Sequence, residues 1–548
     1  MYSDLRRDSW NESRRLDGED DSRQSRRNIV IGWCILLATA WLLTAGLCAF
    51  AQQSSAANTT VRTESGVLSG VIEHDIRVFR GIPFAQPPVG SLRWRAPQPV
   101  APWRGIRPAR EWGHPCMQVQ KQDPGIGPGV PSEDCLTLNV FAPNDAGKSH
   151  PVMVYIYGGA FIQGAASAPL FDGTFFAKQG IVLVTCNYRL GHFGFFAHPA
   201  LTKEAAGAPV GNYGLMDQIA ALQWVRDNIA SFGGDPGRVT IFGESAGGIS
   251  VNNLMISPAA KGLFQAAIAQ SSFGRERTET LAEAEKTGTE EARRWGAASQ
   301  TADALRKIPA GAIVSADATE PPFSLFLDGH VPIIDGKTVP EPVMAGFRAG
   351  HEAPVPFMIG VTARELPHGF GPASFEARVP AYAELPAELR SEYGSEQDFQ
   401  PNFLSEAVLT EPAFTLASYH ALRAPTYVYR FGIASDATLN RFGAAPHGSE
   451  LAYLFQTYAA LPDPTRPRDT QLGAEFASYW VSFGSSKNPN GDNRPLWPEF
   501  AKDQILMFTN DGPKPGPDPV ASRLRALTKD NEAGSIQPLV RTAASNKN

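Results

Sequence analysis

The sequence predicts an α/β fold built on a largely parallel central sheet with helices on both faces. Short, apolar, β-branched runs recur along the chain, as is typical of strands buried on both faces. They cover residues 152–156, 181–185, 239–242 and 356–359. Between the second and third runs, apolar residues recur at helical spacing over residues 216–232. Strand, helix and strand in this order indicate the βαβ unit of a parallel sheet.

Length and charge limit the function classes that the chain can belong to. With 548 residues the chain is long for one domain, although large α/β enzymes often form a single domain. Its hydrophobic content of 43% is enough for a sizeable core. The formal net charge of -6 is small for this length, and no basic stripe or zinc-ligand spacing is present. The composition therefore argues against nucleic acid or an anionic membrane surface as a partner, and no metal is expected.

The chain is divided by composition into an N-terminal region and a long globular region. Residues 1–28 carry seven Arg and seven Asp or Glu, which predicts a disordered, solvated arm. Residues 29–51 are uncharged and mostly apolar. Residues 52–548 contain no repeat and no long linker, and are expected to form one domain. Within it, residues 276–308 are rich in Ala, Glu and Arg and are expected to be a helical insertion covering the carboxyl edge of the sheet.

The apolar stretch allows three interpretations, all of which export the rest of the chain. It follows Arg26 and Arg27 and ends in Ala49-Phe50-Ala51, which is the pattern of a cleaved secretory signal peptide. Residues 29–50 are also long enough to remain as a membrane anchor. The arginine pair resembles part of a twin-arginine export motif. Residues 52–548 are therefore expected to be secreted or periplasmic, or tethered to a membrane.

Cysteine usage is compatible with export. Cys34 and Cys48 lie within the apolar stretch, and Cys186 falls inside a predicted strand as a buried thiol. Cys116 and Cys135 flank a segment rich in Gly and Pro that a disulfide could close. Closing a loop of this length contributes about 3 kcal/mol in the chain-entropy model.

Ser245 is the candidate nucleophile. The segment from Gly243 to Gly247 reads Gly-Glu-Ser-Ala-Gly, directly after the predicted strand at residues 239–242. A helix-compatible stretch, residues 249–256, follows it. This is the G-x-S-x-G nucleophile elbow, whose tight strand-to-helix turn exposes the serine hydroxyl above the sheet. The pattern predicts a hydrolase that forms an acyl-enzyme on Ser245.

A serine hydroxyl needs a general base, which this type of fold supplies from a histidine late in the chain. The histidines after Ser245 are His330, His351, His368, His420 and His447. His420 lies in a segment predicted to be helical, whereas His447 lies in a loop that precedes a helix. Because an imidazole in such a loop can project into a cleft, His447 is the candidate base.

The acidic partner of the histidine should lie just beyond a late strand. Glu365 follows the run at residues 356–359 through a short polar segment. Asp328 and Asp335 are alternatives, although both stand in turns that contain Gly or Pro. Spacing alone leaves the choice open.

A segment after another predicted strand offers an oxyanion hole. Residues 157–161 read Tyr-Gly-Gly-Ala-Phe and follow the run at residues 152–156. The backbone N–H groups of Gly159, Ala160 and Ala246 could converge on one oxygen. Losing one such donor typically raises the barrier by about 3–4 kcal/mol.

Several longer motifs resemble the type-B carboxylesterases, a family that includes cholinesterases, bile-salt-activated lipases and bacterial p-nitrobenzyl esterases. They are residues 79–93, 133–139, 187–191 and 228–236, within a resemblance that runs from residue 61 to residue 500. The motifs are closest to those of the p-nitrobenzyl esterases. The resemblance implies an α/β-hydrolase fold with cap-like insertions, and hydrolysis of small-molecule carboxylic esters without a metal or cofactor.

The resemblance also implies roles for particular residues. It makes Ser245 the nucleophile, His447 the base and Glu365 the acid, in preference to the two aspartates. It further implies that Cys116 and Cys135 form the family's first disulfide. Gly159, Ala160 and Ala246 match the family's oxyanion donors.

Three departures from the family pattern bear on specificity. Ala160 stands where cholinesterases carry a third glycine, and Leu366 follows Glu365 where the family usually has glycine. No Trp lies between Cys116 and Cys135, where cholinesterases place the indole that holds a quaternary ammonium group. A small or bulky organic ester is therefore expected as substrate, rather than a choline ester.

Other functions remain as alternatives. Some members of the family are adhesion proteins that lack the serine, and hydrolysis of long-chain lipids or amides requires the same catalytic residues. For an esterase, activity should fall with pH as His447 becomes protonated, near its reference pKa of about 6.5 unless the site shifts it.

Overall fold

The computed structural model describes residues 59–119, 126–145, 147–275, 279–319, 332–367, 379–461 and 466–534. The chain divides into two compact units, residues 1–60 and 61–548, and the second is described below. The predicted arm at residues 1–28, the apolar stretch at residues 29–51, Asp328, His330 and His368 lie outside the described residues.

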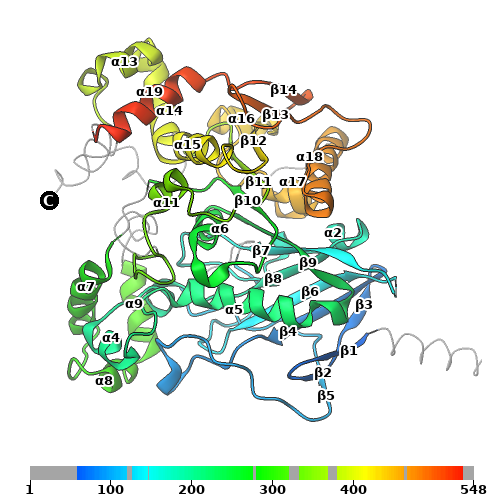
Figure 1. Cartoon of the computed structure of the whole chain (residues 1–548), viewed down its shortest axis with the longest axis vertical. Coiled ribbons are helices and arrows are strands. Elements are labelled where there is room, and N and C mark those ends of the chain that lie inside the picture. The colour runs from blue at the N-terminus through cyan, green and yellow to red at the C-terminus, as the bar shows by residue number, and fades with distance from the viewer. Residues whose placement is uncertain are drawn as a thin grey trace, which may run out of the picture. The chain divides into compact units, whose positions relative to one another are not determined.

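An 11-stranded sheet forms the centre of the second unit (Figure 1). Its strands in spatial order are β14 (Gly512–Pro517), β13 (Gln504–Thr509), β12 (Thr426–Phe431), β11 (Phe357–Thr362), β10 (Ala266–Gln270), β9 (Gly234–Glu244), β7 (His150–Ile156), β8 (Val182–Cys186), β6 (Thr137–Pro143), β4 (Ile76–Pro83) and β3 (Val71–Glu73). The strands from β8 to β13 are parallel, and the pairs at both ends are antiparallel. The predicted α/β fold is confirmed.

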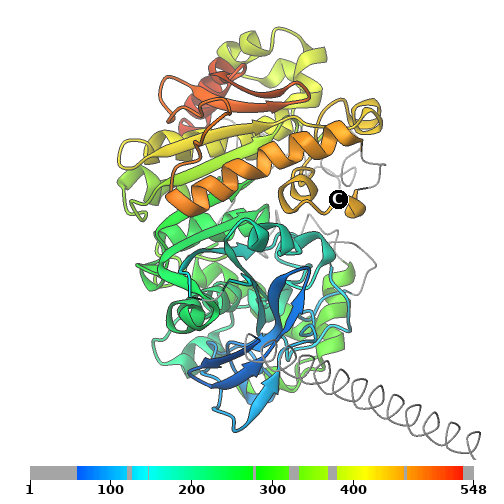
Figure 2. The same cartoon turned by 90° about the vertical axis from the view of Figure 1, so that its right-hand side faces the viewer.

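Two layers of helices cover the sheet (Figures 1 and 2). One face carries α5 (Tyr213–Asn228), α6 (Ala246–Ile256), α11 (Val343–Ala349) and α15 (Glu411–His420). The opposite face carries α2 (Thr174–Lys178), α17 (Leu451–Phe455) and α18 (Pro467–Ser486). The predicted helix at residues 216–232 is α5 followed by a 3₁₀ turn, Ile229–Phe232.

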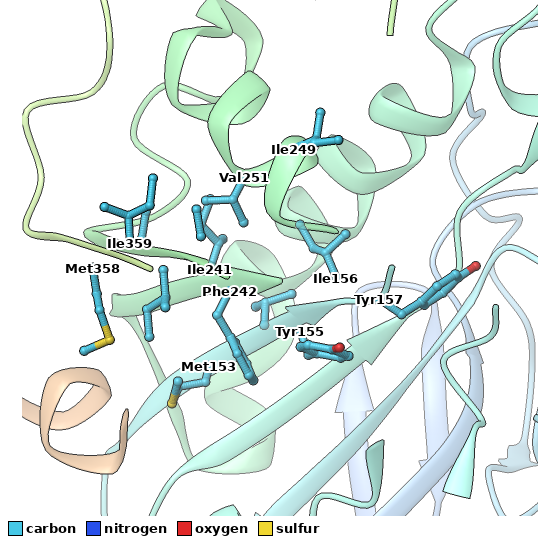
Figure 3. Close-up of a cluster of buried hydrophobic side chains, with 14 of the residues drawn as sticks. Met153, Tyr155, Ile156, Tyr157, Ile241, Phe242, Ile249, Val251, Met358 and Ile359 are labelled. Atoms are coloured by element: carbon cyan, nitrogen blue, oxygen red, sulfur yellow. The ribbon is translucent and has the colours of Figure 1, made fainter. Parts of the chain in front are cut away.

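The core on both sides of the sheet follows from the alternation of side chains along its strands (Figure 3). Toward α6, aliphatic strand residues meet aliphatic residues of the helix: Ile156, Ile241, Ile359, Ile249 and Val251. Larger side chains point to the other face: Met153, Tyr155, Phe242 and Met358. There α18 packs so closely that a Cβ on Gly484 would lie 2.6 Å from the Met153 sulfur.

The predicted helical insertion at residues 276–308 forms two separate helices. The first, α7 (Leu281–Arg294), begins with a capping box between Thr280 and Glu283. It ends before Gly296, whose φ of 78° is left-handed and therefore stops the helix. The second helix is α8 (Ala302–Arg306). Trp295 packs on Trp94 and Phe196 in a second apolar cluster, apart from the main core.

The remaining elements are shorter or lie farther from the centre of the sheet. The helices are α3 (Gly191–Gly194), α4 (Pro199–Ala205), α9 (Ala310–Thr319), α13 (Ala387–Tyr393), α14 (Glu396–Ser405), α16 (Asp436–Phe442) and α19 (Ala521–Glu532), and β1 (Thr60–Thr63), β2 (Gly66–Ser69) and β5 (Ile106–Pro108) form a small sheet. Within the described ranges, no helix is long and apolar enough to cross a membrane.

Candidate active site

Ser245 lies in a strained turn between the end of β9 and the start of α6. Its φ of 57° and ψ of -121° are unfavourable for a residue with a side chain, as expected for a nucleophile elbow. The Ser245 N–H donates to the carbonyl of Gln270 over 2.9 Å, which ties the turn to β10. A Cβ on Gly247 would lie 1.9 Å from the Ile156 carbonyl oxygen, so the elbow requires glycine there.

Glu365 and His447 form a direct pair. Glu365 follows β11, and His447 lies in the loop before α17. His447 Nδ1 lies 2.5 Å from Glu365 Oε2, and the His447 N–H donates to the Glu365 carbonyl over 3.0 Å. These two contacts, one through side chains and one through backbone, fix the orientation of the imidazole ring.

Ser271 completes the surroundings of Glu365 and was not singled out from the sequence. Its hydroxyl donates to Glu365 Oε1 over 2.7 Å, and the Thr362 N–H donates to the same oxygen over 2.5 Å. The Glu365 side chain is fully buried. Burial alone would raise the pKa of Glu365, but His447 and these hydrogen bonds more than offset it and hold the pKa below its usual value. Glu365 is therefore a buried, charged carboxylate.

Glu244, the residue before Ser245, lies against the other nitrogen of the imidazole. His447 Nε2 is 3.2 Å from Glu244 Oε1, and that oxygen is otherwise buried without a hydrogen-bond partner. Within the described residues, the Ser245 hydroxyl makes no hydrogen bond with His447. Catalytic hydrogen bonds often tighten only when substrate binds, so this geometry is compatible with a nucleophile and its base.

A third buried carboxylate, Glu450, lies close to the same ring. The Gln270 side-chain amide donates to Glu450 Oε1 over 3.4 Å. Burial raises the pKa of Glu450 well above its usual value, and the charges of Glu244 and Glu365 raise it further. Burial also raises the pKa of Glu244, to about 7, although His447 opposes the shift. Burial therefore favours the neutral form of Glu450.

These charges change the expected titration of His447. Burial lowers the pKa of the imidazole, but the carboxylates of Glu244 and Glu365 more than offset this effect and raise the pKa to about 9. The pKa of His447 therefore lies above the reference histidine pKa of about 6.5, and activity is expected to fall at a higher pH than that value predicts. The imidazole is protonated near neutral pH in the structure without substrate.

The segment after β7 presents backbone N–H groups beside Ser245. Gly159 has a φ of 106°, and Ala160 and Phe161 have φ values of 55° and 59°. A Cβ on Gly158 would lie 3.1 Å from the Ser245 Cβ, so this segment passes directly beside the elbow. The N–H groups of Gly159, Ala160 and Ala246 donate no hydrogen bond within the part of the chain that the structure describes. They can therefore receive an oxyanion.

The other acids and bases considered from the sequence have different partners. Asp335 Oδ1 accepts hydrogen bonds from the N–H groups of Lys337 and Val339, as in a local turn. His420, in α15, is buried and lies 3.1 Å from Glu352 Oε1. His351 contacts Glu341 on the surface.

The cysteines show two different environments. Cys116 and Cys135 form a disulfide, as the resemblance implied. Cys186 is a free, buried thiol whose pKa is raised by burial to about 12, so it is unreactive at neutral pH. Among the described residues, no three His, Cys, Asp or Glu side chains are grouped so as to hold a metal ion.

The sequence matches the Carboxylesterase family over residues 57–370 and 375–526. The chain belongs to the carboxylesterase family. It is 34% identical to the fumonisin B1 esterase of Sphingopyxis macrogoltabida, in an alignment covering 86% of this chain and 90% of that protein. It is 36% identical to the para-nitrobenzyl esterase of Bacillus subtilis, with 82% and 94% covered.

Solved structures give the same result for the fold. A PNB esterase structure superposes with a TM-score of 0.76 at 32% identity, covering 86% of this chain and 99% of that chain. The predicted resemblance to type-B carboxylesterases and the α/β-hydrolase fold are thereby confirmed. The protein is a carboxylesterase, and its substrates are small-molecule esters.

Proposed function

We propose that this carboxylesterase cleaves uncharged organic esters through an acyl-enzyme on Ser245, with His447 as base and Glu365 as the residue that orients His447. The observation that carries the proposal is the 2.5 Å contact between His447 Nδ1 and Glu365 Oε2. It supports the tautomer with a proton on Nδ1, which leaves Nε2 as the nitrogen that exchanges protons with Ser245.

The proposed reaction has two halves that use the same groups. Neutral His447 takes the Ser245 proton on Nε2 while the serine oxygen attacks the ester carbonyl. The N–H groups of Gly159, Ala160 and Ala246 stabilise the oxyanion, and the proton then passes to the departing alcohol. Water, activated by His447, releases the acid and restores Ser245. Every step uses side chains and backbone groups of this chain.

The resting contact with Glu244 adds a condition to this cycle. While Nε2 carries a proton and faces Glu244, the imidazole cannot accept the proton of Ser245. The enzyme must lose that proton to solvent before the first attack, so the proposed rate rises with pH through the pKa of His447.

The relatives and the sequence both support an uncharged organic ester as substrate. The names of similar proteins include a fumonisin B1 esterase, a para-nitrobenzyl esterase and a human cocaine esterase. The absence of Trp between Cys116 and Cys135 argues against a choline ester. We therefore propose an ester with a small or bulky neutral alcohol group.

The experiment is hydrolysis of p-nitrophenyl esters from acetate to palmitate by the purified protein. Ser245→Ala should abolish turnover, whereas Ser257→Ala, a buried serine just beyond the other end of α6, should not. Turnover that falls with acyl length supports the proposal, and turnover that rises with length would replace it by a lipase. Turnover that persists in Ser245→Ala would contradict the assignment of the nucleophile. If only p-nitroanilides are cleaved, the enzyme is an amidase instead.

We also propose that the catalytic region is exported. The sequence pattern of residues 29–51 supports this, and so does the Cys116–Cys135 disulfide, because disulfides persist mainly in oxidising compartments. Mass spectrometry of the protein from fractionated cells should find an N-terminus at Gln52 outside the cytoplasm, or an intact chain in the membrane fraction. Intact protein in the cytoplasm alone would contradict export.

A further inference from the structure

The disulfide loop touches the proposed oxyanion loop, residues 157–164, through one side chain. Gln118 lies two residues after Cys116 and is buried, with 5% of its surface exposed. Its amide nitrogen donates to the Gly164 carbonyl over 2.8 Å, and its amide oxygen accepts from the Gly164 N–H over 2.9 Å. Both backbone groups of Gly164 are therefore held by one planar amide.

The same amide of Gln118 is also hydrogen-bonded to its own segment. Its amide nitrogen also donates to the Cys116 carbonyl over 3.0 Å, and Cys116 is bonded to Cys135. The side chain cannot turn without breaking three hydrogen bonds, each of which is buried. Gln118 is therefore a rigid spacer between the disulfide and Gly164.

Gly164 in turn supports the start of the oxyanion loop. Its φ of 119° suits only glycine, and a Cβ there would lie 2.6 Å from the Tyr157 ring and 2.9 Å from the Gly158 carbonyl oxygen. The loop closes between these contacts, because the N–H groups of Ile162 and Gln163 both donate to the Gly159 carbonyl over 3.1 Å. Gly164 therefore packs directly against Tyr157 and Gly158, the residues just before Gly159.

Two further contacts hold the loop, but at other points. The Tyr188 hydroxyl donates to the Tyr157 carbonyl over 2.7 Å, and the Gly191 N–H donates to the Phe161 carbonyl over 2.7 Å. Neither reaches the C-terminal end of the loop, where Gln118 makes the side-chain contacts with Gly164. Removing the amide would take away the side-chain contacts of Gly164, while the beginning of the loop and Ala166, whose N–H donates to Asn187 Oδ1 over 2.9 Å, stay anchored.

We propose that Gln118 is a positioning residue for catalysis, which holds the oxyanion loop so that the Gly159 and Ala160 N–H groups point at the developing oxyanion. The inference rests on the proposed function, in which these groups stabilise the tetrahedral intermediate. A displacement of the N–H groups by a few tenths of an ångström weakens their hydrogen bonds to the oxyanion. A loosened loop therefore weakens transition-state binding more than substrate binding.

The test is Gln118→Met, which keeps the length of the side chain and removes its hydrogen bonds. The matched control is Asn510→Leu. Asn510 makes the same pair of amide contacts with Ala434, at 3.0 and 3.1 Å, in a turn after β13. Both variants leave the backbone N–H and C=O of one residue without their side-chain partners, so both should lower the melting temperature. Only Gln118→Met should change the chemistry.

Two measurements separate positioning from stability. On p-nitrophenyl acetate, Gln118→Met should lower kcat on the order of 10- to 100-fold with KM nearly unchanged. Its affinity for a trifluoromethyl ketone should fall by a similar factor. That inhibitor reacts with Ser245 by addition of the serine oxygen to the ketone carbon, while His447 takes the proton and the new oxyanion enters the hole. Gln118→Asn, which keeps the amide but shortens its reach by one methylene, should lie between wild type and Gln118→Met.

The outcomes distinguish this inference from the proposed function. If folded Gln118→Met keeps the wild-type kcat, or loses activity without losing affinity for the ketone, Gln118 does not position the oxyanion loop. If Asn510→Leu loses kcat equally, the effect is one of stability and the inference fails. Should Gln118→Met not fold, Gln118→Asn decides alone by the same criteria. If the Ser245→Ala variant keeps the activity of the wild-type enzyme, the proposed function itself is wrong.

Discussion

Two carboxylates flank the imidazole of His447, and they differ in every respect except burial. Glu365 accepts hydrogen bonds from Ser271 and Thr362 and contacts Nδ1, and its pKa is held below the usual value. Glu244 faces Nε2 through an oxygen with no hydrogen bond, and burial raises its pKa to about 7. Burial is common to both carboxylates, so the difference comes from the charge of His447 and the hydrogen bonds that lower the pKa of Glu365, and from the charge of Glu365, which helps to raise the pKa of Glu244.

Glu365 and Glu244 are therefore expected to have different roles in catalysis. In the proposed mechanism, a charged Glu365 orients the ring and stabilises the imidazolium formed when Ser245 attacks. Glu244 is poised to change charge near neutral pH and acts on the nitrogen that exchanges the proton. Glu365 should therefore control the size of kcat, and Glu244 should control its dependence on pH.

The largest effect is expected from Glu365→Gln, which removes the charge and keeps the shape. The amide can favour the wrong tautomer of His447, so kcat for p-nitrophenyl acetate should fall on the order of 10³- to 10⁴-fold, as for the acid of other triads. Circular dichroism and the melting temperature check that the variant is folded. A loss of kcat of less than about tenfold would show that Glu365 is not the acidic residue of the triad, and the difference drawn between Glu365 and Glu244 would be wrong.

A shift along the pH axis is expected from Glu244→Gln. Wild-type kcat/KM should rise with pH toward about 9, because His447 must be neutral to act as a base and its pKa is raised to about 9. Removing the charge 3.2 Å from Nε2 should move this rise to lower pH by about 1 to 3 units.

Glu450→Gln is the matched control for that shift. Glu450 is also buried, and burial raises its pKa well above the usual value, which favours its neutral form. Among the carboxylates that raise the pKa of His447, the charge of Glu244 has the largest effect and that of Glu450 the smallest, so Glu450→Gln should move the pH profile less than Glu244→Gln does. Equal shifts in the two variants would mean that Glu244 has no special relation to Nε2.

The smallest effect is expected from Ser271→Ala, which removes one hydrogen bond from Glu365 Oε1. The Thr362 N–H still donates to that oxygen, so kcat should fall only about tenfold, with a loss of about 1–3 kcal/mol in stability. Ser405→Ala is the control, because the Ser405 hydroxyl accepts from the Leu366 N–H and supports the backbone rather than the carboxylate. The melting temperature and kcat of both variants are measured together. A larger kcat loss in Ser405→Ala than in Ser271→Ala would contradict the role given to Ser271.

Much of the fold could be predicted from the sequence, because buried parallel strands leave continuous apolar runs. The edge strand β14 could not, since it reads Gly-Pro-Lys-Pro-Gly-Pro and resembles a loop. Its Pro residues are compatible with a strand only because it lies at the edge of the sheet, next to β13 alone. The break between α7 and α8 depends on Gly296, which an overall helical composition does not reveal.

The candidate site was predictable where a local motif exists, and unpredictable where only tertiary contacts define a residue. Ser245 lies in a five-residue motif, and the order of the chain suggested His447. Ser271 is 94 residues from Glu365 in sequence, and Gln118 is 46 residues from Gly164. Neither stands in a pattern that indicates its partner. Glu244 lies inside the motif, but its relation to His447 arises only when the loop before α17 folds over β9.

The central claim is that Ser245 is the nucleophile that forms the acyl-enzyme, and the most direct test is to identify the residue that reacts. A fluorophosphonate probe should add one adduct to the purified enzyme, and peptide mapping by mass spectrometry should place it on Ser245. Ser245→Ala should remain unlabelled, and labelling of wild type should accelerate as pH rises and His447 loses its proton. An adduct on another residue, or none on an enzyme that still hydrolyses esters, would contradict the mechanism proposed for this carboxylesterase.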